Sequence, residues 1–432
     1  MSSKADPLAS CFGLLPPGST VASVLSLTVT CLGAGILGIP AAAGYCGLVM
    51  GFFYLFLTSC FTIFSLHILA VVMEKHGLRT FDEATRKLMG PAACYFVAAV
   101  RLCNSFGTCM IYIICIKQIA LTILIDKTFE QAATGQNRTL AFFSGEVGKC
   151  CLLAAVWCVV VYPFVLLNKP SVLRFASIFT VLFVLIFVVS IMTHSCINSI
   201  PSFRNPSHPH ASNVDGYNGG RFAFKGLGVI LFSYFCHLNC FEVYWGMKDR
   251  STSRFTICAI CAITICSFLY VMTVAFAYGE FGRNLVDSVV LMYHPVPAYM
   301  LAAFVLMACS ISCSHALHTL QLRNIVCSIF GWKVGSLPFW KHAVVATVLS
   351  VAILLSGMTF NRMNGVVALV GALCGGFLSF IFPGLLYMYS GNWTTETVGV
   401  TRFCGTYVLL LWGVVALVLG TASSIHSFVV DS

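Results

Sequence analysis

The chain has 432 residues, of which 59% are hydrophobic and only 9% are charged, and its formal net charge is +10. Soluble domains carry about 25% charged residues, so this composition excludes a water-soluble globular protein. The basic residues are scattered between long apolar runs and form no stripe, which argues against nucleic-acid binding.

The apolar runs predict eleven membrane spans, since a spanning helix needs roughly 20 mostly apolar residues. We expect these spans at 19–44, 46–73, 92–125, 149–168, 172–196, 226–248, 255–279, 298–320, 339–357, 364–390 and 402–427. Thr80–Glu83 is typical of a capping box that opens a short helix on the inner face. We expect a second short helix across the outer face at Leu285–Tyr293.

The 22 cysteines lie almost entirely within these apolar segments. A free cysteine there packs as a small apolar residue, so we expect no disulfide framework. Motifs for nucleotide binding or hydrolysis are also missing, and the sequence therefore predicts no enzyme, no cofactor and no metal site.

Lysine and arginine are more frequent in the connections that face inward when the N-terminus is inside. This bias predicts a cytoplasmic N-terminus, and an odd number of spans then gives an extracellular C-terminus. The sequon at Asn137 falls in an outer loop and is the expected glycosylation site, whereas the sequon at Asn392 falls on the inner side.

A loop rich in proline, serine, asparagine and glycine divides the chain into two sets of five spans. Two five-helix repeats in inverted orientation are a recurrent transporter plan. The expected divisions are a tail at 1–18, the first repeat at 19–196, an outer loop at 197–225, the second repeat at 226–390, and the eleventh helix with a short outer C-terminus at 391–432.

The first span contains the run Gly33-Ala34-Gly35-Ile36-Leu37-Gly38-Ile39-Pro40, which is poor material for a continuous helix. Unwound backbone at bilayer depth is tolerated only where it lines a cavity. Its free N–H groups suit a carboxylate, and its free carbonyls suit an ammonium group. Close helix packing also uses small residues, but Pro40 favours a break.

The sixth span carries His237, Asn239 and Glu242 in an otherwise apolar segment, where polar groups usually face a cavity or a partner. Glu242 is the only acidic residue that we expect inside a span. It could reach a long substrate side chain, or it could pair with Lys117, Arg101 or Lys248.

Two further spans offer polar side chains to the same region. In the third span, Asn104, Ser105 and Thr108 share a helix face. In the eighth span, Ser310 and Ser312 are candidates for binding a coupling ion, and Ser314, His315 and His318 are candidates for other contacts. Serine in membrane helices often bonds only its own backbone.

Several segments in this order resemble the amino acid/auxin permease family, and within it the kinetoplastid amino-acid transporters. These segments are the glycine run of the first span, Phe106-Gly107-Thr108-Cys109, Leu173-Arg174-Phe175-Ala176-Ser177, Asn239-Cys240-Phe241-Glu242-Val243-Tyr244, Ala316-Leu317-His318, Leu373-Cys374-Gly375-Gly376-Phe377, Ile381-Phe382-Pro383 and Met388-Tyr389-Ser390-Gly391-Asn392-Trp393. The chain departs from the family pattern at Gly246, where an acid is usual, and at Gln321, where a proline is usual.

This resemblance implies two inverted five-helix repeats, an eleventh helix, and transport of amino acids by alternating access. It places the substrate between the interrupted first and sixth helices, at Gly33, Ala34, Gly35, Ile36, Tyr234, His237 and Asn239. Many relatives are coupled to protons or sodium, so either ion is an expected partner.

The sequence therefore favours a secondary amino-acid carrier in the plasma membrane. A neutral substrate is favoured over a cationic one, because Glu242 is the only acid available for a cationic side chain. A polyamine carrier is the alternative within transport, and a channel, a receptor or a membrane-embedded enzyme is an alternative outside it.

Overall fold

The computed structural model describes residues 18–132, 145–166, 170–198, 214–220, 223–285, 287–294, 296–332 and 338–431. All regular structure within these ranges is helical. Within the described residues, ten helices are long and apolar enough to cross a membrane, or eleven when one bent pair counts as a single span. This confirms the all-α membrane fold. The expected glycosylation site, Asn137, lies outside the described residues.

The first five spans follow the expected ranges closely. They are the pair α2 (Thr20–Cys31) and α3 (Gly35–Cys46), then α4 (Leu48–His76), α6 (Pro91–Ala132), the run α8 (Glu146–Val156), η1 (Trp157–Val161) and α9 (Tyr162–Val165), and α10 (Pro170–Asn198).

Several of the remaining six spans combine α-helices with 3-10 or π-helical turns. They are α12 (Ala223–Ser233) with η2 (His237–Asn239) and α13 (Cys240–Gly246); α14 (Thr252–Thr273) with η3 (Val274–Tyr278), α15 (Gly279–Phe281) and η4 (Gly282–Asn284); α16 (Ala298–Ile329); α17 (Phe339–Thr359); α18 (Met363–Val370) with η7 (Gly371–Gly375), η8 (Phe377–Ile381) and α19 (Phe382–Met388); and α21 (Val400–Asp431).

The first span is broken where the glycine run predicts. The axes of α2 and α3 differ by 55° across residues 32–34. Pro40 lies one turn inside α3, where its missing N–H removes a backbone hydrogen bond from the ladder. The sixth span is interrupted at residues 234–236 and continues as a single 3-10 turn before α13 begins.

The short helix α5 (Phe81–Met89), expected on the inner face, begins at the predicted cap. The hydroxyl of Thr80 accepts the Glu83 N–H at 3.1 Å, but the Glu83 carboxylate accepts the N–H of Arg79, one residue earlier than in a full capping box. The connection at 285–293, expected across the outer face, forms only a 3-10 turn, η5 (Val289–Met292), where a short helix was expected. A further short helix, α20 (Thr395–Val398), precedes α21.

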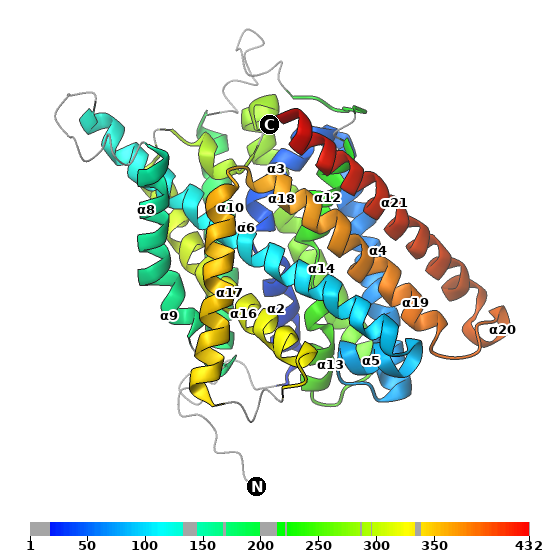
Figure 1. Ribbon diagram of the computed structural model, residues 1–432. Coiled ribbons are helices and arrows are strands. Elements are labelled where there is room, and N and C mark those ends of the chain that lie inside the picture. The colour runs from blue at the N-terminus through cyan, green and yellow to red at the C-terminus, as the bar shows by residue number, and fades with distance from the viewer. Residues whose placement is uncertain are drawn as a thin grey trace.

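The helices form one bundle, with α5 and α13 at the lower end of Figure 1 and α3, α18 and the C-terminus at the upper end. The span built on α12 is the most enclosed, with 83% of its apolar window buried, whereas the span built on α8 reaches only 22%. The helix α12 packs against α3 and α18, and α6 packs against α16 and α18. The interrupted spans therefore lie at the centre of the bundle.

Candidate functional site

The two interrupted spans meet at their breaks. The hydroxyl of Tyr270, from α14, lies 2.7 Å from the Cys31 carbonyl at the end of α2 and 2.8 Å from the Ser233 carbonyl at the end of α12. A phenol has one proton, so Tyr270 donates to one of these carbonyls at a time. Tyr270 is fully buried. A single side chain thus joins both breaks in the middle of the bundle.

Two glycines at the first break allow neighbouring helices to approach it closely. A Cβ atom on Gly35 would overlap Ser233, lying 2.9 Å from its Cα. A Cβ atom on Gly33 would lie 2.6 Å from the hydroxyl oxygen of Tyr112, which comes from α6. Ala34 and Ile36 are completely buried beside them. The four predicted residues of the first span therefore lie at the break, between α12 and α6.

In the sixth span, Tyr234 and His237 bind neighbouring helices through their side chains. The Tyr234 hydroxyl lies 2.8 Å from the Ser267 hydroxyl of α14. The Nε2 atom of His237 lies 3.1 Å from the hydroxyl of Ser65, and Ser65 donates to the Ser379 carbonyl. His237 Nδ1 has no hydrogen-bond partner among the described residues, although the residue is fully buried.

Asn239 links three spans through its amide group. Its Nδ2 atom donates to the Thr30 hydroxyl of α2 at 2.8 Å, and its Oδ1 atom accepts from Gln321 Nε2 of α16 at 2.6 Å. Gln321 is the residue that stands where a proline is usual in the family pattern. We call the side chains of Asn239, Thr30 and Gln321 the inner bridge. Asn239 directly precedes α13, which lies at the lower end of the bundle in Figure 1.

The wall between α6 and α16 carries buried polar atoms with no partner among the described residues. They are Asn104 Nδ2, Ser105 Oγ, His315 Nδ1 and His318 Nδ1. The His318 ring packs against Tyr112, with 5.5 Å between ring centroids, and Tyr112 in turn contacts Gly33. Polar groups left open in this way are available for a bound polar solute.

The expected ion-coupling serines are both buried in α16. The hydroxyl of Ser312 donates to the Ala308 carbonyl of its own helix at 2.8 Å. The structure describes no side-chain hydrogen bond for Ser310, so the sequence-based proposal for this pair rests on burial alone.

Glu242 lies on the exposed side of α13. The expectation that it is the only acid in a span is wrong, because Glu280 lies within the Thr252–Asn284 span. The Glu280 carboxylate lies 2.8 Å from His194 of α10. Two of the bases considered for Glu242 bind other groups: Arg101 pairs with Asp82 at 2.7 Å, and Lys117 donates to the Phe360 carbonyl at 2.8 Å.

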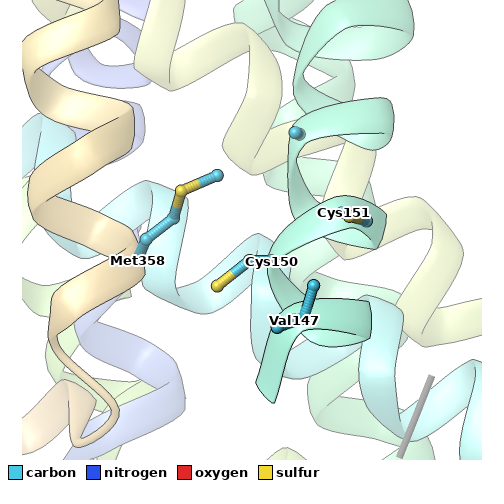
Figure 2. A pocket seen from close by; sticks show the side chains of 5 residues that line it. Val147, Cys150, Cys151 and Met358 are labelled. Atoms are coloured by element: carbon cyan, nitrogen blue, oxygen red, sulfur yellow. The ribbon is translucent and has the colours of Figure 1, made fainter. Parts of the chain in front are cut away.

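A surface pocket between α8 and α17 is not a suitable amino-acid site. Figure 2 shows Cys150 and Met358 in this pocket, which Val147, Cys151 and Ala154 also line. Val147 is 69% exposed on the outside of the bundle. Binding a zwitterion requires charged groups or strong hydrogen-bond donors, and the lining of this pocket offers neither.

Sequence reasoning did not identify Tyr112 and Tyr270 as site residues. A tyrosine in a membrane helix is an ordinary packing residue, and only the fold shows which one faces a break. The one available signal was that Tyr270 lies in the middle of a span, away from the interfaces where membrane tyrosines concentrate.

Comparison with known proteins identifies a transporter family and several related transporters. The family model "Transmembrane amino acid transporter protein" matches residues 16–428. The chain is 24% identical over 420 residues to Solute carrier family 38 member 8 of Homo sapiens, covering 93% of this chain and 91% of that protein. It is 25% identical over 420 residues to Sodium-coupled neutral amino acid transporter 7 of Xenopus laevis, covering 94% and 88%.

A third relative is Vacuolar amino acid transporter 5 of Schizosaccharomyces pombe, which is 22% identical over 380 residues. The match covers 85% of this chain and 83% of that protein. These relatives come from animals and a yeast, so the likeness to the kinetoplastid branch stays a prediction. The family consists of membrane transporters, which confirms that the chain is not an enzyme. With its match over nearly the whole sequence, the chain belongs to the family of transmembrane amino acid transporter proteins.

Proposed function

We propose that this chain is a secondary active transporter that carries neutral amino acids by alternating access. The observation that carries the proposal is the meeting of two interrupted spans at Tyr270, in the middle of the bundle. Irregular backbone at membrane depth is found where it lines a cavity or a binding site. Transporters with inverted repeats bind their substrates at such breaks.

The first break supplies groups for both charges of an amino acid. The helix α3 begins at Gly35, and the first N–H groups of a helix have no partner within the helix. The positive end of the helix dipole adds to their attraction for a carboxylate. The carbonyls at the end of α2 attract an ammonium group. We propose that Gly33, Ala34, Gly35 and Ile36 bind the substrate backbone in this way.

The surroundings of the breaks favour an uncharged substrate side chain. Tyr234, His237, Asn239 and Asn104 present hydroxyl, imidazole and amide groups, while Glu242 lies on an exposed helix face. A cationic side chain would need a buried acid close to the break. The name of the Xenopus laevis relative, a sodium-coupled neutral amino acid transporter, agrees with this preference.

We further propose that transport is driven by a proton or sodium gradient, with Ser310 and Ser312 as candidate ion ligands. The proposed location is the plasma membrane, with the N-terminus in the cytoplasm and a glycan on Asn137. A relative named as a vacuolar transporter makes an internal membrane the alternative location that localisation experiments must separate.

An uptake panel tests the proposal. Transport-deficient cells that express the chain are given labelled neutral, cationic and acidic amino acids and a polyamine, with and without proton and sodium gradients. We expect saturable uptake of neutral amino acids that collapses when one gradient is removed. Uptake of the polyamine alone, or flux that does not saturate, would contradict the proposal.

A further inference from the structure

The outer loop between η4 and α16 is fastened to the bundle by one carboxylate. Asp287 Oδ1 accepts the backbone N–H of Asn364 at 2.7 Å. Its Oδ2 atom accepts the backbone N–H of Met363 at 3.1 Å and Nε2 of Gln118 at 2.8 Å. Met363 and Asn364 are the first two residues of α18, and Gln118 belongs to α6. The carboxylate therefore caps one helix and binds a second.

The side chain of Asn364 extends this attachment to the first span. Asn364 is completely buried, and its Nδ2 atom lies 3.1 Å from the Asp287 carbonyl and 3.3 Å from the Gly38 carbonyl of α3. The outer loop, α3, α6 and α18 are thus held by one set of hydrogen bonds. We call Asp287, Gln118 and Asn364 the outer clamp.

The connection between α17 and α18 is held at the same place. The ammonium group of Lys117 donates to the carbonyls of Gly357 and Phe360 at 3.1 and 2.8 Å, and to Asn361 Oδ1 at 3.0 Å. Lys117 and Gln118 are both buried and adjacent in α6. The start of α18 is therefore fixed from two sides.

The energetics favour a strong attachment. A carboxylate at a helix N-terminus binds free N–H groups and interacts favourably with the helix dipole. Burial raises the pKa of Asp287 from its ordinary value, while the donors from Asn364, Gln118 and Met363 and the nearby charge of Lys225 oppose that rise. Hydrogen bonds to a charged group are stronger than those between neutral groups.

The clamp lies beside the first-helix break, because Asn364 donates to the Gly38 carbonyl near the start of α3. The helix α3 is the outer half of the first span, and it packs against α18 and against η5 in the clamped loop. Cys115, one turn before Gln118 in α6, is completely buried with its sulfur 3.0 Å from that of Met363. Water or a solute entering from the outer side along α6 and α18 would have to separate these two residues.

We propose that Asp287 is a positioning residue of the transport cycle, which holds the outer entrance closed and must release α18 and α6 before the outer side opens. The inference rests on the proposed alternating-access function. Asp287 touches no substrate; it acts by controlling the position of α18.

Cys115 is a native reporter for this movement. The purified full chain in lipid nanodiscs is treated with a charged, water-soluble thiol reagent, and modification is measured residue by residue by mass spectrometry. We expect Asp287→Asn to raise the rate of Cys115 modification roughly tenfold, because the amide cannot accept both helix N–H bonds as the carboxylate does. Gln118→Ala removes the bonds from Gln118 to Asp287 and to the Asn361 carbonyl but leaves both helix N–H bonds, and we expect a smaller increase.

Two controls separate a clamp from a merely structural role. Asp215→Asn removes another outer carboxylate, which pairs with Arg283 and does not bind α18, and it should leave Cys115 protected. Cys266 is completely buried between α14 and α2, away from the clamp. Its modification rate should stay unchanged in Asp287→Asn, whereas general loosening of the fold would raise both rates together.

The proposed role of the clamp is wrong if Cys115 stays protected in both Asp287→Asn and Gln118→Ala. It is also wrong if the modification rates of Cys115 and Cys266 rise equally. If Asp287→Asn does not fold, Gln118→Ala alone decides, and an unchanged Cys115 rate then overturns the inference. The labelling uses no substrate. Normal uptake without a Cys115 response therefore rejects the clamp alone, whereas the absence of any amino-acid uptake rejects the proposed function and the role of Asp287 in it.

Discussion

Gly35 shows how one residue serves both a helix break and close packing. The glycine run allowed two interpretations from sequence, a broken helix or a tight helix contact. The structure contains both, because α3 begins at Gly35 and the same residue touches Ser233 across the break. Only a residue without a Cβ atom allows the two interrupted spans to approach this closely.

We expect Gly35→Ala to lower the initial rate of amino-acid uptake by at least roughly tenfold, since overpacking a tight contact costs about 1–3 kcal/mol. Gly279→Ala is the matched control, because an added Cβ atom there meets no atom within 4 Å. Uptake is measured per molecule at the cell surface. Equal uptake by the two variants would show that the contact with Ser233 is not needed for transport.

The inner bridge gives a second prediction for single residues. Gln321→Leu removes the donor to Asn239 Oδ1, a partly buried acceptor, and loss of such a hydrogen bond costs about 0.5–1.5 kcal/mol. The inner side should then open more often. We expect the buried Cys236, between α12 and η2, to react roughly tenfold faster with a thiol reagent in inside-out vesicles. A rate unchanged from the wild type would exclude a closing role for the bridge.

At the scale of the elements, the sequence predicts where helices lie but not how their ends are held. Apolar length fixes the spans, and the glycine run with Pro40 fixes the first break. The break in the sixth span has no glycine run or proline to mark it. The hydroxyl that binds its Ser233 carbonyl comes from Tyr270, which lies in another span. The prediction of Glu242 as the only acid in a span failed because α14 continues through η3 and α15 to include Glu280.

Tyr270→Phe tests whether one hydroxyl stabilises both breaks. The variant leaves the Cys31 and Ser233 carbonyls without this donor, and we expect a loss of about 1–3 kcal/mol in the free energy of unfolding. The thermal unfolding temperature in detergent should fall, and uptake should fall with it. Tyr54→Phe is the control, since Tyr54 is also buried and its hydroxyl makes no hydrogen bond that the structure describes. Equal shifts in both variants would contradict this role.

At the scale of the whole molecule, the most enclosed spans carry the proposed site and the least enclosed ones face outward. The share of buried window residues falls from 83% for the α12 span to 33% for α21 and 22% for the α8 span. Contacts such as Asp287 with Gln118 join residues 169 positions apart. Local sequence patterns carry no information about such pairs, so the outer clamp could not be predicted before the fold was known.

The orientation of the whole chain is tested by its two sequons. With the N-terminus in the cytoplasm, Asn137 faces outward and Asn392, which is exposed between α19 and α20, faces inward. Endoglycosidase treatment should therefore increase gel mobility for the wild type and for Asn392→Gln, and have no effect on Asn137→Gln. A glycan on Asn392 would require the opposite orientation.

The central claim is that backbone groups at two helix breaks bind the zwitterionic part of an amino acid. The most direct measurement is equilibrium binding of a labelled neutral amino acid to the purified chain, in competition with its decarboxylated and deaminated analogues. We expect that neither analogue competes effectively and that Gly35→Leu abolishes binding while the protein remains folded. Wild-type affinity in Gly35→Leu, or equal competition by either analogue, would contradict the account.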